Sequence, residues 1–138
     1  MSKRDLKEDC YLEALESHVV SVEMILNRIN QIQNVKGKFD DYILQHDKMQ
    51  TILDLELALA ALCVLLRKMA ENGFIHLDLD LRRDVNSIIH SNRFEYRPYG
   101  VVVFSQKGKE NVDLDHLLNF CHQVMLEDDK KPFYEGIR

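Results

Sequence analysis

Hydrophobic and polar residues in the first half of the chain alternate with the period of a helix. From about residue 5 to 34, apolar residues recur at spacings of three and four, which places them in one stripe along a helix. The stripe consists of Leu12, Leu15, Val19, Val22, Leu26 and Ile29. A second helix is predicted over about 40–72, after a break at Gly37. Its residues 57–66 are apolar on all sides, so we expect this part to be enclosed. The expected core includes Leu59, Leu62 and Leu66.

The elements that follow are shorter. Asn72-Gly73 before Phe74 is typical of a left-handed helix cap with a hydrophobic contact beyond it. Asp78 or Asp80 can cap a third helix over about 79–92. The core face of this helix consists of Leu81, Val85, Ile88 and Ile89.

A strand and a last helix are predicted after the third helix. Pro98-Tyr99-Gly100 should turn the chain, and the β-branched and aromatic residues 101–104 predict a strand. Lys107-Gly108-Lys109 can turn this strand back into a short hairpin. Asp113 or Asp115 should cap a last helix over about 113–127, and the tail 128–138 is expected to be loose.

Long helices that are joined by short loops usually pack as antiparallel neighbours. The pattern therefore predicts a mainly α protein, an antiparallel four-helix bundle with a short β-hairpin inserted before the last helix. Residues 1–138 should form a single helical domain. The long stripe of the first helix is heptad-like. It can serve as a seam within one chain or between two chains, and periodicity does not separate these alternatives.

Composition is that of an ordinary globular protein, with 46% apolar and 30% charged residues. The three cysteines, Cys10, Cys63 and Cys121, are far apart in sequence and do not form a disulfide framework, which suits a reducing compartment. The first nine residues lack the apolar region of a secretory signal. The longest apolar run is shorter than the roughly twenty residues of a membrane span. We therefore expect a cytoplasmic protein without a membrane partner.

The net charge of −5 disfavours general nucleic-acid binding, because phosphate affinity comes mostly from Lys and Arg. The charge is unevenly distributed, however. Residues 82–97 contain four arginines and two acids, a local excess of two positive charges. An ordinary solvated, salt-bridged surface is the simpler explanation of this excess.

Arg83 and His90 are the residues with the clearest chemical potential. Seven residues span about two helical turns, so both side chains should leave one face of the helix, roughly 10 Å apart along its axis. Asn86 and Ser87 lie between them. An arginine offers a planar fork of donors to phosphate oxygens, and a histidine can transfer a proton near neutral pH. We call Arg83, Asn86, Ser87 and His90 the polar face of this helix.

The segment 83–90 resembles the signature of the HEPN superfamily, an Arg, a polar residue, and a His after four to six intervening residues. Arg83 matches the Arg, Asp84 the polar residue and His90 the His. The resemblance implies a compact helical bundle, a homodimer and, for many members, metal-independent cleavage of RNA. The implied mechanism uses the 2′-hydroxyl of the RNA as nucleophile. His90 would be the base or acid, and Arg83 of both protomers would hold the scissile phosphate.

The same resemblance implies roles for neighbouring residues. Asp84 would orient Arg83, and Asn86 would bond to phosphate or ribose. Further candidates for binding RNA are the arginines that could steer it and the tyrosines that could stack a base. These are Arg82, Arg93, Arg97, Tyr96 and Tyr99.

Metal and cofactor sites are not indicated. His116 and His122 are six residues apart and should point to different faces of the last helix, and neither Cys-x-x-Cys nor His-Glu-x-x-His is present. No phosphate-binding glycine loop suggests a nucleotide cofactor.

Two functions fit these observations. The first is a HEPN-like endoribonuclease of a defence or toxin–antitoxin system, with RNA as substrate and a composite site across a homodimer. The second is a non-catalytic helical module that binds a partner protein. It would be an antitoxin-like partner, a phage or plasmid inhibitor, or an inactive HEPN relative.

Overall fold

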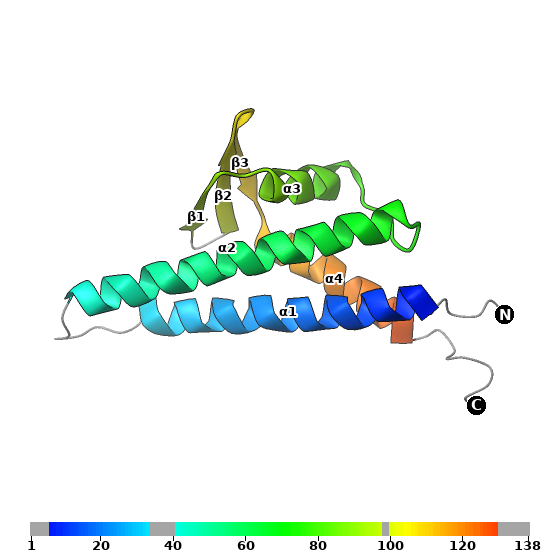
Figure 1. The fold of residues 1–138 in the computed structure, drawn as a ribbon, viewed down its shortest axis with the longest axis horizontal. Helices are drawn as coiled ribbons and strands as arrows, with labels where there is room; N and C mark the ends of the chain where they lie inside the picture. The colour runs from blue at the N-terminus through cyan, green and yellow to red at the C-terminus, as the bar shows by residue number, and fades with distance from the viewer. Residues whose placement is uncertain (1–5, 34–40, 98–99, 130–138) are drawn as a thin grey trace.

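The computed structural model describes residues 6–33, 41–97 and 100–129. It is mainly helical, with four helices and a small antiparallel sheet before the last helix (Figure 1). The elements in chain order are α1 (Leu6–Gln33), α2 (Asp41–Glu71), α3 (Leu79–Ile89), β1 (Arg93–Arg97), β2 (Gly100–Ser105), β3 (Gly108–Val112) and α4 (Leu114–Asp129). The predicted breaks at Gly37 and at Pro98-Tyr99 lie outside the described residues.

Helices α1 and α2 form a long antiparallel pair (Figure 1). The stripe that was predicted along α1 is buried within the chain: Leu15 and Val22 are fully buried, and Val19 and Ile29 nearly so. The stripe is therefore an intramolecular seam. The predicted core residues of α2 are also confirmed, and Leu59, Leu62 and Leu66 are fully buried.

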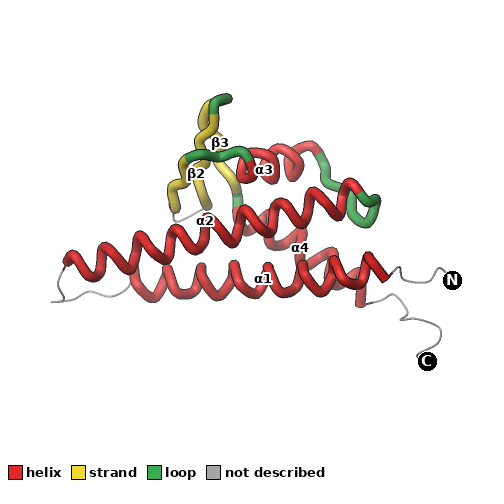
Figure 2. The backbone as a smooth tube through the Cα atoms, in the orientation of Figure 1, coloured by secondary structure: helices red, strands yellow, loops and turns green. Residues whose placement is uncertain are grey.

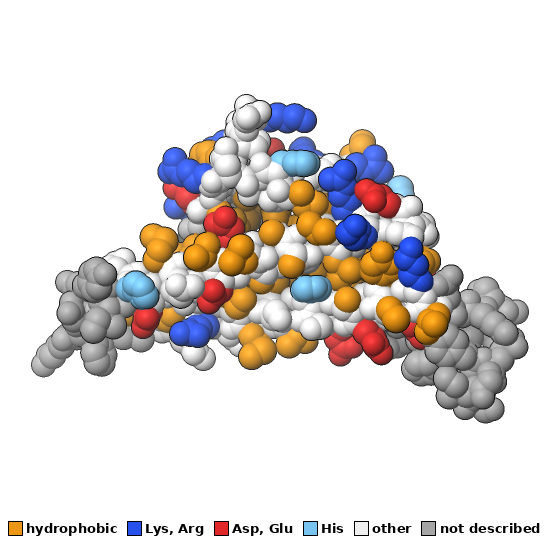
Figure 3. All heavy atoms as spheres, viewed as in Figure 1, with side chains coloured by type: hydrophobic (Ala, Val, Ile, Leu, Met, Phe, Trp, Pro, Cys, Tyr) orange, Lys and Arg blue, Asp and Glu red, His pale blue; other side chains and the backbone are white. Residues whose placement is uncertain are grey.

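The outward side of α2 is unusually apolar. Its exposed large side chains lie at helical spacings: Met49, Leu53, Leu57 and Val64. Figure 3 shows hydrophobic side chains following α2 on the face drawn there. By length and composition alone, Leu44–Glu71 could also cross a membrane, although a helix that contributes to a protein core passes the same test.

The sheet has the order β1-β2-β3, with both pairs antiparallel. Sequence analysis predicted only β2 and a returning strand, so β1 corrects that prediction. The turn also comes one residue earlier than predicted, because Ser105 pairs with Gly108 and Gln106-Lys107 connect them. Gly100 allows a close approach of the chain. Its φ is 153°, and a Cβ there would clash with the carbonyl oxygen of Val112.

Helix boundaries follow the predicted caps. The side chain of Asp78 accepts a hydrogen bond from the Leu81 N–H at 2.8 Å, and Asp113 accepts one from the His116 N–H at 3.1 Å. At the end of α2, Gly73 has a φ of 78°, and the Phe74 N–H donates to the carbonyl oxygen of Met69 at 3.0 Å. This bond pattern is the predicted left-handed cap.

Two predicted helix ends differ from the structure. Helix α3 ends at Ile89 instead of residue 92, and Ser91 donates both its N–H and its hydroxyl to the carbonyl oxygen of Ile88. Helix α4 continues to Asp129, so residues 128 and 129 are helical and not part of a loose tail. The rest of the predicted tail, 130–138, lies outside the described residues.

Helix α3 and the sheet lie on the side of α2 that is opposite α1, and α4 packs against α1 and β2 (Figures 1 and 2). A bundle of four helices is not confirmed as the architecture, because α3 packs against β2 and β3 as well as α2. The consequence for the site is that the polar face of α3 has the end of the sheet as its neighbour.

Candidate functional site

The polar face of α3 forms one wall of an open pocket. All four of its residues line this pocket, which has a volume of about 780 Å³. Arg83 and His90 are exposed, and Asn86 and Ser87 are partly buried. His90 does not lie within the helix, because α3 ends at Ile89. It is the C-cap, and its N–H donates to the carbonyl oxygen of Asn86 at 3.0 Å.

The opposite wall comes from the end of the β2–β3 hairpin and from Asn92, which follows α3. The hairpin residues are Ser105, Gln106, Lys107, Gly108, Lys109 and Glu110. Apart from Gly108, every residue that lines the pocket has a polar or charged side chain. Three cations and one acid line it, so this region is positive although the chain has a net charge of −5. Such a lining favours an anionic ligand.

Two acids hold the guanidinium of Arg83. Its Nε lies 2.9 Å from a carboxylate oxygen of Glu110 on β3, and one terminal nitrogen lies 3.5 Å from a carboxylate oxygen of Asp80 on α3. The Glu110 side chain is 31% exposed, whereas that of Asp80 is 75% exposed. The Glu110 pair is therefore the better shielded and shorter of the two, and it ties the polar face to the sheet.

Asp84 lies on the buried side of α3, with only 6% of its surface exposed. One of its carboxylate oxygens, Oδ1, is buried without a hydrogen-bond partner. Burial raises the pKa of this carboxyl from 3.8 to about 6; Arg83 and His116 lower it, and Glu110 and Asp80 raise it. Asp84 therefore does not pair with Arg83 as the resemblance implied. Glu110 and Asp80 contact Arg83 instead.

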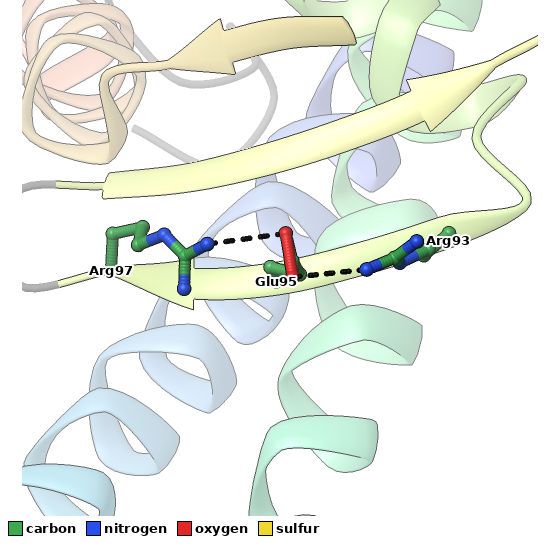
Figure 4. A network of polar contacts seen from close by, with 3 residues as sticks. All are labelled: Arg93, Glu95 and Arg97. Carbon is green, nitrogen blue, oxygen red and sulfur yellow. Dashed lines mark hydrogen bonds and ion pairs between the residues drawn. The ribbon is translucent and has the colours of Figure 1, made fainter.

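The other predicted arginines lie apart from the pocket lining. Arg93 and Arg97 are both on β1, and each contacts a different carboxylate oxygen of Glu95 at 3.2 Å (Figure 4). The guanidinium of Arg93 also lies over the ring of Phe104, 4.8 Å from its centre. One acid thus partly neutralises two of the arginines expected to steer RNA. Arg82 is exposed on α3 and does not line the pocket.

The two tyrosines proposed to stack a base do not join the pocket. Tyr96 is partly buried and packs against the hydrophobic core from β1. Tyr99 lies outside the described residues. On the face drawn in Figure 3, Lys and Arg side chains gather over α3 and the sheet. The positive region predicted from sequence therefore exists, but its members are spread over several surfaces.

The histidines and cysteines outside the pocket do not form a cluster. Within residues 6–33, 41–97 and 100–129, no group of three or more His, Cys, Asp or Glu side chains is arranged to hold a metal ion. His122 on α4 contacts Glu23 on α1 at 2.9 Å, which joins the two helices. Cys63 and Cys121 are fully buried, and Cys10 is exposed.

Sequence reasoning missed the whole hairpin wall of the pocket. Lys107 and Lys109 were considered only for the turn, and Glu110 was not considered. The only signal in the sequence was the density of polar side chains around Gly108. That signal does not say which helix the turn faces, because the approach of β3 to α3 is a tertiary contact.

Comparisons with protein-family models, with curated proteins and with solved structures give no significant match to this chain.

Proposed function

We propose that this protein is a HEPN-like, metal-independent endoribonuclease that acts in the cytoplasm, as part of a defence or toxin–antitoxin system. The observation that carries the proposal is the pocket, whose lining combines Arg83, His90 and two lysines with neutral polar side chains. These are the groups that phosphodiester cleavage requires, namely cations for the phosphate and a proton-transfer group that works near neutral pH.

In the proposed reaction, the 2′-hydroxyl of the RNA attacks the adjacent phosphorus while a general base removes its proton. The bond to the 5′-oxygen breaks, a general acid protonates that oxygen, and a 2′,3′-cyclic phosphate remains. His90 is the proton-transfer residue, Arg83 stabilises the charge on the phosphate oxygens, and Asn86 donates to phosphate or ribose. Within this mechanism Asp84 has no contact with the substrate, because it is buried.

The reaction needs both a base and an acid, and among the residues that line the pocket His90 is the only histidine. A second copy of the chain would supply the second histidine, and this supports a homodimer in which two polar faces meet. We also propose that the four helices form a HEPN-like bundle, with the sheet inserted before α4. The exposed apolar side chains of α2 offer further surface for association.

The decisive experiment is cleavage of single-stranded RNA by the purified protein in the presence of a chelator. His90→Ala should reduce the rate roughly a hundredfold or more, because the proton-transfer group is lost. Arg83→Ala should also reduce it, and Arg83→Lys should not fully restore it, because an ammonium group lacks the planar fork. Both side chains are exposed. The free energy of unfolding should change by less than about 0.5 kcal/mol for His90→Ala, and by up to about 1 kcal/mol for Arg83→Ala, which removes the contacts with Glu110 and Asp80.

His122→Ala is the matched control, because His122 is an exposed histidine on α4 that does not line the pocket. It should cleave like the unmodified protein. Cleavage by both His90→Ala and Arg83→Ala at the original rate would overturn the proposal, as would a preparation of the unmodified protein that leaves every RNA tested intact.

A second candidate is a non-catalytic module that binds a partner protein. The exposed apolar side chains Met49, Leu53, Leu57 and Val64 on α2 favour it. The pairing of Arg83 with Glu110 also suits a structural role for that arginine. If Leu53→Ser and Leu57→Ser abolished the effect of the protein in cells while His90→Ala preserved it, the binding-module hypothesis would replace the ribonuclease hypothesis.

A further inference from the structure

The hairpin wall of the pocket has two lysines whose side chains form no ion pair with the described residues. Lys107 lies in the turn between β2 and β3, and Lys109 lies in β3. Both side chains are exposed, and neither forms an ion pair with another residue of the described chain. Both residues line the pocket, as do Ser105 and Gln106, whose side chains carry neutral donors. This wall can therefore accept negative charge without breaking an existing contact.

Arg83 on the other wall differs in this respect. Its guanidinium already contacts Glu110 at 2.9 Å and Asp80 at 3.5 Å. A phosphate that binds Arg83 must displace at least one carboxylate, so it exchanges one charge-assisted contact for another and gains little by itself. Glu110 is the principal competitor, because its contact is the shorter one and its side chain is the less exposed.

We propose that Lys107 and Lys109 hold the phosphates that flank the scissile one. We also propose that the contact of Glu110 with Arg83 keeps an isolated phosphate from binding Arg83. The site therefore selects a polynucleotide over free phosphate or a mononucleotide. Only a strand that gains the contacts to both lysines has enough binding energy to displace Glu110. This inference rests on the proposed function for the identity of the scissile phosphate.

The size of the pocket agrees with this selection. A volume of about 780 Å³ is within the range of about 300–1,000 Å³ that accommodates drug-sized ligands, and it exceeds what a single phosphate needs. The neutral side chains Asn86, Ser87, Asn92 and Gln106 are spread between the cationic groups, where they can bond to ribose or base edges.

The first test measures binding of a fluorescent eight-nucleotide oligouridine with 2′-O-methyl groups, which lacks the nucleophile and remains uncut. The double variant Lys107→Ala/Lys109→Ala should weaken binding at least about tenfold at low salt. The slope of log affinity against log salt should become shallower by about 1.4, since each phosphate contact on a single strand contributes about 0.7.

The matched control is Lys48→Ala/Lys68→Ala, which removes the same charge from α2, away from the pocket. It should change affinity by less than about twofold. Equal weakening in the two double variants would overturn the proposal, because the effect would then come from net charge alone.

The second test concerns Glu110. Inorganic phosphate should compete poorly with the oligonucleotide in the unmodified protein, beyond the effect of its ionic strength, which a matched chloride series measures. Glu110→Gln should make phosphate about tenfold more effective as a competitor, because Arg83 is then released. Asp80→Asn is the control and should have a smaller effect. If Glu110→Gln leaves the competition unchanged, Glu110 has no selective role and the proposal is wrong.

These binding measurements do not require catalysis. A protein that binds the oligonucleotide through both lysines but never cleaves RNA would refute the proposed function and preserve the polynucleotide site. A protein that cleaves RNA but binds equally well without the lysines would do the reverse.

Discussion

The α1–α2 pair and the region of α3 and the sheet bury different kinds of side chain. Between α1 and α2, the buried residues are apolar except Thr51, whose hydroxyl donates to the carbonyl oxygen of Asp47 at 2.7 Å. Under α3, the buried set includes Asp84, and one of its carboxylate oxygens lacks any hydrogen-bond partner. One region satisfies its buried polar group, and the other does not.

The two regions therefore differ in role: the apolar seam supports folding, and the region of α3 and the sheet holds the reactive groups. An apolar seam contributes to folding without presenting reactive groups, whereas a buried carboxyl and a cationic pocket both cost free energy unless something offsets them. Buried, unpaired titratable groups occur frequently near functional sites. The candidate site lies on α3, so it is in the region that contains the buried carboxyl.

The largest effect is expected from shortening a core side chain of α2. Leu62 is fully buried, and Leu62→Ala should lower the free energy of unfolding by about 3–5 kcal/mol, through lost apolar contact and the cavity that remains. Urea denaturation followed by circular dichroism measures this. Leu57→Ala is the control, because Leu57 is 61% exposed on the same helix, and it should cost less than about 1 kcal/mol. Equal costs would contradict the assignment of the inner and outer faces of α2.

An effect of opposite sign is expected at Asp84. Above pH 6 this carboxyl is ionised in both states, so its burial cost is complete, and Asp84→Asn should stabilise the protein by roughly 2 kcal/mol at about pH 7.5. As the pH falls through about 6 toward 3.8, the folded form takes up the proton first. The cost then disappears, and the advantage of Asp84→Asn should vanish by about pH 4.

Urea denaturation at several pH values checks this prediction. Asp80→Asn serves as its control, because the Asp80 side chain is 75% exposed and its loss of charge should change the free energy of unfolding by less than about 1 kcal/mol. If Asp84→Asn were less stable than the unmodified protein at about pH 7.5, the attraction of Arg83 and His116 for the carboxylate would outweigh its burial. The contrast between the two regions would then be lost.

The smallest effect is expected on β1. Glu95 pairs with both Arg93 and Arg97 (Figure 4), whose side chains are 66% and 45% exposed. Glu95→Gln should change the free energy of unfolding by less than about 1 kcal/mol, because surface ion pairs are screened by water and salt. Thermal unfolding in low and high salt gives the value. A loss of several kcal/mol would mean that this face of the sheet is a stabilising element comparable with the α1–α2 seam.

Much of the helical framework is predictable from local signals. The apolar period gives α1 and α2 to within a residue or two, and Asp78, Gly73 and Asp113 give the caps. The end of α3 is not predictable in this way. The Asn92 N–H donates to the carbonyl oxygen of Phe104 at 2.9 Å, so pairing with β2 replaces further helix. A bond to a residue twelve positions away leaves no local pattern.

Strand β1 shows a signal that was present and overlooked. Phe94 and Tyr96 pack against the core, while Arg93, Glu95 and Arg97 alternate with them, which is the period of a half-buried strand. The polar face of α3 was predicted from the spacing of its four residues, although His90 is the C-cap and not part of the helix. The second wall of the pocket was not, because the hairpin reaches α3 only in the folded chain.

The three cysteines differ in exposure, so their reactivity can report how often the core opens. Cys10 is exposed, whereas Cys63 and Cys121 are fully buried on α2 and α4, and burial, together with the charge of Glu23, raises the pKa of Cys121 to about 12. A thiol reagent should therefore modify one site at once and the other two only when the core opens. The delay between these events records how often the helices separate, without any label being engineered.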